Sequence, residues 1–138
     1  MQLYTIGYGG RTPDELVTAL KEHSIRAVVD VRLRPDRSSM GAYVKAKDPD
    51  KGIEGLLRRA GIPYFSFVEL GNLFLDFDDW QVRYPRLMEK AGDLLTERLL
   101  QAPQPFCLMC AEKAADRCHR AIIAGYLARQ GFEIEHIE

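Results

Sequence analysis

The stretch Ile25-Arg26-Ala27-Val28-Val29-Asp30-Val31-Arg32 decides the fold of this chain. Its centre is continuously apolar, which is typical of a parallel strand covered on both faces. Asp30 and Arg32 stand two positions apart at its end, so their side chains are expected to share a face. A buried strand of this kind predicts an α/β domain, with helices packed against the sheet.

Apolar segments of strand length alternate along the chain with segments of helical periodicity, as in an α/β protein. We expect strands at residues 3–6, 25–31, 62–67, 106–110 and 132–137. We expect helices at residues 13–22, 49–60, 87–99 and 117–130. The sequence therefore predicts a single α/β domain over residues 1–138, built on a mostly parallel five-stranded sheet with helices on both faces.

Capping residues mark three of the helix starts. Thr12 and Glu15 have the spacing of a capping box. Asp48 is placed to cap the second helix, and Asp116 to cap the last. With Asp116 as the cap, Cys118 lies in the first turn of that helix. The free N–H groups and the helix dipole there favour an anion, such as a bound phosphate or a thiolate.

Length and composition describe one ordinary globular domain. The 138 residues are 46% hydrophobic and 28% charged, which excludes a mostly disordered chain. No apolar run approaches the ~20 residues that span a bilayer, so we expect no membrane segment. The N-terminus lacks a basic segment followed by a long apolar one, so we expect no secretory signal. Three cysteines in such a chain predict reduced thiols and a cytoplasmic location.

The net charge of −1 is unevenly spread along the chain. Residues 26–68 carry nine basic and five acidic side chains, whereas residues 69–97 carry three basic and seven acidic ones. A basic stretch attracts phosphates, although two solvated faces of opposite charge explain the pattern more simply. The overall balance argues against a dedicated binder of duplex DNA, whose domain is usually clearly basic.

Polar residues gather where the predicted strands end. They are the segments Gly7-Tyr8-Gly9-Gly10, Asp30-Val31-Arg32, Glu69-Leu70-Gly71 and Cys110-Ala111-Glu112. Ligands bind outside the carboxyl ends of the strands in open parallel sheets, so we expect these segments to form one site. Residues 33–48 are predicted to be a long loop, of a kind that is often functional.

Cys110 and Cys118 are able to approach each other across the loop between the fourth strand and the last helix. Three interpretations stay open: a nucleophile with a resolving partner, a metal site that adds Cys107 and His119, or two unrelated thiols. Cys107 and Cys110 are three residues apart on a strand and should face opposite sides of the sheet. Structural zinc needs four convergent ligands, so we expect no metal, and no cofactor is indicated.

Five segments together resemble the domain-of-unknown-function 488 family over essentially the whole chain. They are Thr5-Ile6-Gly7-Tyr8, Asp30-Val31-Arg32, Glu69-Leu70-Gly71, Leu108-Met109-Cys110-Ala111-Glu112 and Arg117-Cys118-His119-Arg120. The resemblance implies an α/β domain of bacteria or archaea and a site at these motifs, but no particular reaction. The chain departs from the family in three places: Tyr8 stands where many relatives have histidine, Asn72 replaces a common glycine, and the segment 36–50 is unusual in its spacing.

The leading hypothesis is a small enzyme with an anion site at the carboxyl edge of the sheet. Its ligand would be a phosphate-bearing small molecule, such as a nucleotide, or a nucleic-acid end. The candidate catalytic residues are Cys118, Cys110, Glu112, Glu69 and His119. The candidate ligand-binding residues are Gly7, Tyr8, Asp30, Arg32, Gly71, Arg117 and Arg120. A cysteine would be the nucleophile or redox thiol, a glutamate would carry protons, and the arginines would hold the anion.

Two other hypotheses fit the same residues. One is a non-catalytic module that binds a nucleotide or single-stranded nucleic acid, and its affinity should fall steeply with salt. The other is a structural or partner protein, in which the polar cluster serves stability alone. The density of Arg, Glu and Cys at one predicted edge favours the enzyme. The sequence defines no oligomeric state.

Overall fold

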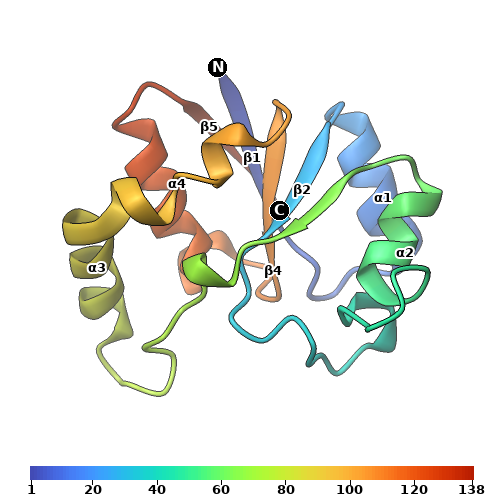
Figure 1. The fold of residues 1–138 in the computed structure, drawn as a ribbon, viewed down its shortest axis with the longest axis horizontal. Helices are drawn as coiled ribbons and strands as arrows, with labels where there is room; N and C mark the ends of the chain where they lie inside the picture. The colour runs from blue at the N-terminus through green and yellow to red at the C-terminus, as the bar shows by residue number, and fades with distance from the viewer.

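A computed structural model describes residues 1–138 and contains five strands and four α-helices (Figure 1). The strands are β1 (Gln2–Gly7), β2 (Ala27–Asp30), β3 (Tyr64–Ser66), β4 (Phe106–Cys110) and β5 (Glu133–Ile137). The helices are α1 (Pro13–Glu22), α2 (Gly52–Arg59), α3 (Trp80–Leu95) and α4 (Arg120–Ala128). The strand order is β3-β2-β4-β1-β5, and every neighbouring pair is parallel. The predicted single α/β architecture is therefore confirmed.

Helices cover both faces of the sheet, with α1 and α2 on one face and α3 and α4 on the other (Figure 1). The central strands β2 and β4 supply side chains to both cores. Val28 and Cys107 pack toward α1 and α2, whereas Val29 and Cys110 pack with the core beneath α3 and α4. This two-sided burial is the reason that both strands are continuously apolar. It also confirms that Cys107 and Cys110 face opposite sides of the sheet.

The start of α1 is as predicted, because Thr12 and Glu15 form the complete capping box. Helix α3 differs from the prediction, since it begins at Trp80 rather than at residue 87 and includes Pro85. Its first turn is closed by the carbonyl of Asp79, and the Asp79 carboxylate pairs with Arg83 at 2.7 Å. Pro85 lies in the second turn, where its missing N–H removes a single intrahelical bond.

The predicted starts of α2 and α4 are wrong. Asp48 does not cap α2, because its carboxylate accepts a hydrogen bond from the N–H of Asp50 in the preceding turn. Asp116 lies inside a short 3₁₀ turn, Ala115–Arg117, that comes before α4. The N–H of Cys118 closes this turn on the carbonyl of Ala115 at 3.0 Å. Cys118 therefore has an extended backbone and stands two residues before α4, not in its first turn.

None of the four helices is both long enough and apolar enough to cross a membrane.

The loop after β4 is fixed against the end of β1. The N–H of Tyr8 donates to the carbonyl of Cys110 at 3.0 Å, and the N–H of Gly9 to that of Ala111 at 2.8 Å. Gly7 packs directly on the carbonyl of Glu112, with no room for a side chain. The close approach of these two backbones brings the ends of β1 and β4 to one place.

We predict that Gly7→Ala destabilises the fold, because the new Cβ would overlap the Glu112 carbonyl oxygen. Forced overpacking of this kind costs about 1–3 kcal/mol or more. The matched control is Gly125→Ala in α4, where a Cβ meets open space and should stabilise the helix by up to about 1 kcal/mol. Urea unfolding of both variants measures the difference, and equal stabilities would contradict the close packing at Gly7.

Candidate functional site

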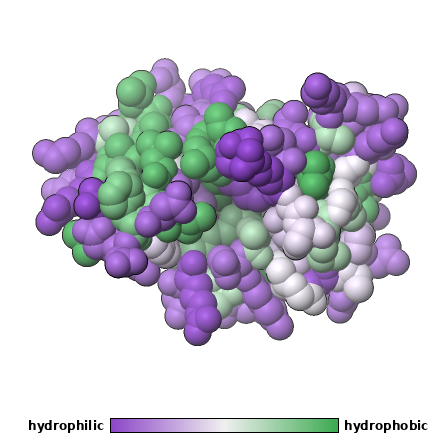
Figure 2. Space-filling model, turned by 90° about the horizontal axis from the view of Figure 1, so that it is seen from below, coloured by the Kyte–Doolittle hydropathy of each residue, from purple (hydrophilic) through white to green (hydrophobic).

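A pocket of about 290 Å³ opens at the carboxyl edge of the sheet. Its walls come from the ends of β1, β2 and β4, from the segment before α4, and from residues 72–80. Figure 2 looks onto this side of the molecule and shows a hollow with apolar surface on the α3 side and hydrophilic side chains around it. Three of the four strand-end segments named from the sequence therefore contribute to one cavity, as in other open parallel sheets, whereas Glu69-Leu70-Gly71 does not line it.

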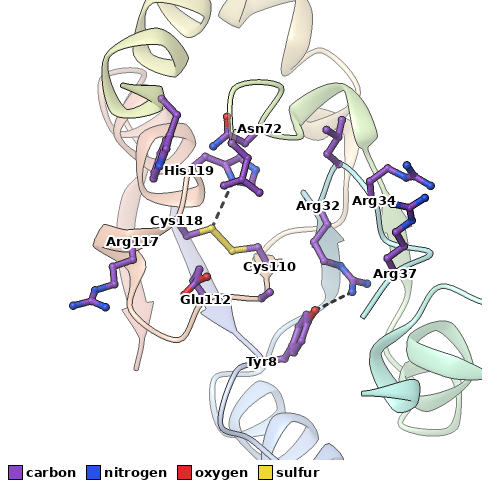
Figure 3. Close-up of a pocket in the computed structure, with 14 residues that line it drawn as sticks. Tyr8, Arg32, Arg34, Arg37, Asn72, Cys110, Glu112, Arg117, Cys118 and His119 are labelled. Atoms are coloured by element: carbon purple, nitrogen blue, oxygen red, sulfur yellow. Dashed lines mark hydrogen bonds between the residues drawn. A yellow bond between two sulfur atoms is a disulfide. The ribbon is translucent and has the colours of Figure 1, made fainter. Parts of the chain in front are cut away.

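Cys110 and Cys118 lie at the pocket and are joined by a disulfide (Figure 3). Both residues are buried, with 3% and 6% of their surface exposed. The expectation of three reduced thiols is thus wrong for this pair, and only Cys107 is a free thiol. Burial raises the pKa of Cys107 well above its usual range, so this thiol stays protonated.

His119 lies beside the disulfide with its ring held in one orientation. Its Nε2 lies 2.8 Å from the carbonyl oxygen of Val31, and its Nδ1 lies 3.6 Å from Sγ of Cys118. Because a carbonyl only accepts hydrogen bonds, Nε2 carries the proton. Burial lowers the pKa of His119, which keeps the ring neutral. The unprotonated Nδ1 therefore faces Cys118 as a hydrogen-bond acceptor.

Asp30, Arg32 and Tyr64 form a buried polar cluster at the end of β2. Arg32 donates to both carboxylate oxygens of Asp30, and the shortest contact, from Nη2, is 2.6 Å. Tyr64 donates its hydroxyl proton to the same carboxylate, also at 2.6 Å. Burial lowers the pKa of Arg32, but the hydrogen bonds and charge of Asp30 outweigh it and raise the pKa above its usual value. Arg32 reaches the pocket through Nη1, which donates to the hydroxyl of Tyr8 at 3.3 Å.

Three further arginines surround the pocket and are exposed to solvent. Arg34 and Arg37 follow β2 on one side of the disulfide, and Arg117 lies on the opposite side (Figure 3). Arg34 pairs with Asp36 at 3.1 Å, whereas Arg37 and Arg117 form no ion pair. Glu112 is the only carboxylate among the lining residues. The pocket therefore has an excess of positive charge, and two of its guanidiniums have no carboxylate partner.

An apolar wall completes the pocket, formed by Leu33, Leu75 and the half-buried ring of Trp80. Gly71 does not line the cavity but allows this wall to close. A Cβ at Gly71 would lie 2.5 Å from Cα of Leu33, so any larger residue would push Leu33 away. An apolar wall beside cationic side chains suits a ligand that has both a ring and an anionic group.

The model of a protein family, described as domain of unknown function DUF488, matches residues 12–127. The chain belongs to the DUF488 family. The match covers most of the chain and bears out the resemblance seen in the motifs. No curated protein and no solved structure matches this DUF488 domain. The description of the family assigns it no reaction.

Seven of the twelve residues predicted for the site line the pocket of the DUF488 domain. They are Tyr8, Arg32, Cys110, Glu112, Arg117, Cys118 and His119. Asp30 and Gly71 stand behind the pocket wall, where they hold Arg32 and Leu33. Gly7 supports the loop after β4 through close backbone packing.

The other two predicted residues lie elsewhere. Glu69 is held away from the pocket by Arg98, whose Nε and Nη2 each donate to it at 2.8 Å. These hydrogen bonds lower the pKa of Glu69, so the proposed pair of Glu69 with Glu112 does not form. Arg120 is fully buried and donates to the carbonyls of Glu112 and Lys113, so its guanidinium faces the loop rather than the pocket.

Cys107 is separated from the other two cysteines by the sheet, and no cluster of three or more metal-ligating side chains is present. The metal interpretation that joined Cys107 to Cys110, Cys118 and His119 is therefore wrong.

The sequence did not identify half of the pocket lining. The lining residues that were not named as candidate site residues are Leu33, Arg34, Arg37, Asn72, Leu75, Trp80 and Ala111, of which Ala111 lies in the strand-end segment Cys110-Ala111-Glu112. Two signals pointed toward them: the long loop predicted at residues 33–48 and the excess of basic residues over residues 26–68. Trp80 belongs to no motif in the sequence, and the start of α3 at this residue brings it to the pocket.

We predict that Asp30→Asn destabilises the domain by about 3–5 kcal/mol, because it leaves the buried Arg32 without its counter-charge. The control is Asp36→Asn, which removes an exposed partner of Arg34 and should cost no more than about 1 kcal/mol. Chemical denaturation measures both changes. Similar losses in the two variants would contradict a structural role specific to the buried pair.

Proposed function

We propose that this DUF488 domain is a small enzyme that binds a phosphate-bearing ligand at the carboxyl edge of its sheet. The observation that carries the proposal is the combination of two unpaired guanidiniums, Arg37 and Arg117, with a cysteine pair in one pocket. Guanidiniums bind phosphates through charge-assisted hydrogen bonds. A thiol at such a site can act on the ligand as a nucleophile once the disulfide is reduced.

The pocket has a cationic region and an apolar region, which suit two different parts of one ligand. Arg37 and Arg117 would bind the phosphate, and the wall made by Leu33, Leu75 and Trp80 would take an apolar ring such as a base. A volume of about 290 Å³ suits a mononucleotide or the terminal nucleotide of a strand rather than an extended chain. Glu112, as the carboxylate in the pocket, would carry protons in the reaction.

The test uses Trp80, which is the one tryptophan of the chain and lies in the pocket wall. We predict that adenosine monophosphate changes its fluorescence saturably and that adenosine binds more weakly. Arg37→Ala and Arg117→Ala should each weaken binding of the nucleotide about tenfold, the effect of losing one charge-assisted contact. Higher salt should also weaken it, because these side chains are exposed.

The control variant is Arg129→Ala, which removes an exposed arginine that also has no ion pair but lies outside the pocket. Equal affinities for adenosine and its monophosphate would overturn the anion site. The same holds if the Arg37 and Arg117 variants behave like the Arg129 variant. Binding without turnover or a covalent cysteine adduct, unchanged in Cys110→Ser and Cys118→Ser, would instead support the non-catalytic binding module.

A further inference from the structure

Arg120 is a fully buried guanidinium without a carboxylate partner. Its donors reach the hydroxyl of Thr5, Sγ of Cys110 and the carbonyls of Glu112 and Lys113. Burial of an ion is costly unless an opposite charge compensates it. Burial also lowers the pKa of Arg120, although an arginine stays charged in proteins. The fold thus holds a buried cation that lacks a counter-ion.

The other charged or titratable groups around Arg120 do not supply this counter-ion. The carboxylates of Glu112 and Glu138 act on it only from beyond 4 Å, and Arg11 adds further positive charge. Cys107 is also close enough to act on Arg120, but its burial keeps it a neutral thiol. The remaining group is Cys110, whose Sγ lies 3.2 Å from Nη1 of Arg120. A sulfur in a disulfide is neutral, whereas a thiolate at this position would pair with the guanidinium directly.

We propose that Cys110 and Cys118 form a redox-active couple whose reduced state is a Cys110 thiolate paired with Arg120 and a Cys118 thiol. This activity goes beyond binding of an anion and does not depend on which anion the pocket takes. The reductant is a low-molecular-weight dithiol, small enough to enter the pocket that both cysteines line.

The surroundings of Cys118 differ from those of Cys110, because no guanidinium contacts its sulfur. The unprotonated Nδ1 of His119 lies 3.6 Å from Sγ of Cys118 and accepts the proton of a thiol there. His119 stays neutral because burial lowers its pKa, so it brings no positive charge to this sulfur. The two cysteines of the pair therefore have different partners. Cys110 contacts the charged guanidinium of Arg120, whereas Sγ of Cys118 has a neutral imidazole and the backbone N–H of Arg120, which donates to it at 3.5 Å.

The reduction proceeds in two displacements. A thiolate of the dithiol attacks Sγ of Cys118, the disulfide breaks, and Cys110 leaves with the electron pair as a thiolate beside Arg120. The second thiolate of the reductant attacks the mixed disulfide, and Cys118 leaves and takes up one proton. The protein gains two electrons and one proton. The dithiol loses two electrons and two protons, becomes a cyclic disulfide and releases one proton to solvent.

Stabilisation of the leaving thiolate should make the disulfide a stronger oxidant, because a stabilised reduced form raises the reduction potential. We predict that wild-type protein equilibrates reversibly in mixtures of reduced and oxidised glutathione, with Cys110 and Cys118 changing state together. Arg120→Gln should shift the equilibrium constant at least tenfold toward the disulfide, which is about 30 mV for a two-electron couple. Acid quenching, alkylation and mass spectrometry measure the fraction of each state.

Cys107 is the internal control for folding, since its burial protects it from alkylation in the folded protein. If Arg120→Gln exposes Cys107, the variant has unfolded, and two variants that keep Arg120 decide the question. In Cys118→Ser, the Cys110 thiol should be alkylated with a pH midpoint well below the ordinary value of about 8.5. In Cys110→Ser, the Cys118 thiol should not show this lowering.

Three results would overturn the proposal. They are a Cys110 midpoint that is ordinary or above that of Cys118, a folded Arg120→Gln protein with the wild-type equilibrium, and a pair that does not re-form its disulfide with excess oxidised glutathione. None of these measurements uses a phosphate ligand. A failure of the redox couple is therefore distinguishable from a failure of the anion site.

Discussion

The buried guanidinium of Arg120 is the interaction on which the pocket depends. Its Nη1 and Nη2 bind the carbonyls of Glu112 and Lys113 at 2.6 and 3.0 Å, and thereby fasten the loop after β4 to the start of α4. On the side of β1, the same loop packs directly against the backbone of Gly7, because this residue has no side chain. Glu112 and Arg117 owe their positions to this attachment, because both belong to the segment between β4 and α4 that it holds.

The domain contains two buried arginines, Arg32 and Arg120, and they differ in whether a carboxylate compensates their charge. Arg32 is compensated by the Asp30 carboxylate at 2.6 Å, so its charge is stable whatever the pocket contains. Arg120 meets only neutral acceptors, one of which is a cysteine sulfur whose charge depends on redox state. A compensated cation such as Arg32 serves to support the pocket wall. An uncompensated one such as Arg120 favours a reaction that creates an anion beside it, here the reduction of Cys110 to a thiolate.

The sequence predicted those features that depend on burial and on local hydrogen bonds. Continuous apolar runs in β2 and β4 predicted a two-sided sheet, and the spacing of Cys107 and Cys110 predicted their opposite faces. The start of α4 could not be predicted in the same way. Asp116 is a good cap by residue type, but it lies in the 3₁₀ turn Ala115–Arg117, and α4 begins only at Arg120. The hydrogen bonds from Arg120 to the carbonyls of residues 112 and 113 are tertiary contacts, which a local sequence pattern does not reveal.

The pocket wall was harder to predict because its parts meet only in the folded chain. Arg37 and Trp80 stand 43 positions apart and belong to a loop and a helix start with no shared motif. Arg120 was misplaced for a different reason. Its place in a motif beside Cys118 suggested contact with a ligand, but its long side chain reaches the hydroxyl of Thr5 in β1 instead.

The two negative groups that the proposals bring to this site therefore have separate cations. A phosphate would meet the solvent-exposed Arg37 and Arg117, whereas a Cys110 thiolate would meet Arg120 from beneath. Because neither anion needs the cation of the other, one small pocket is able to hold both.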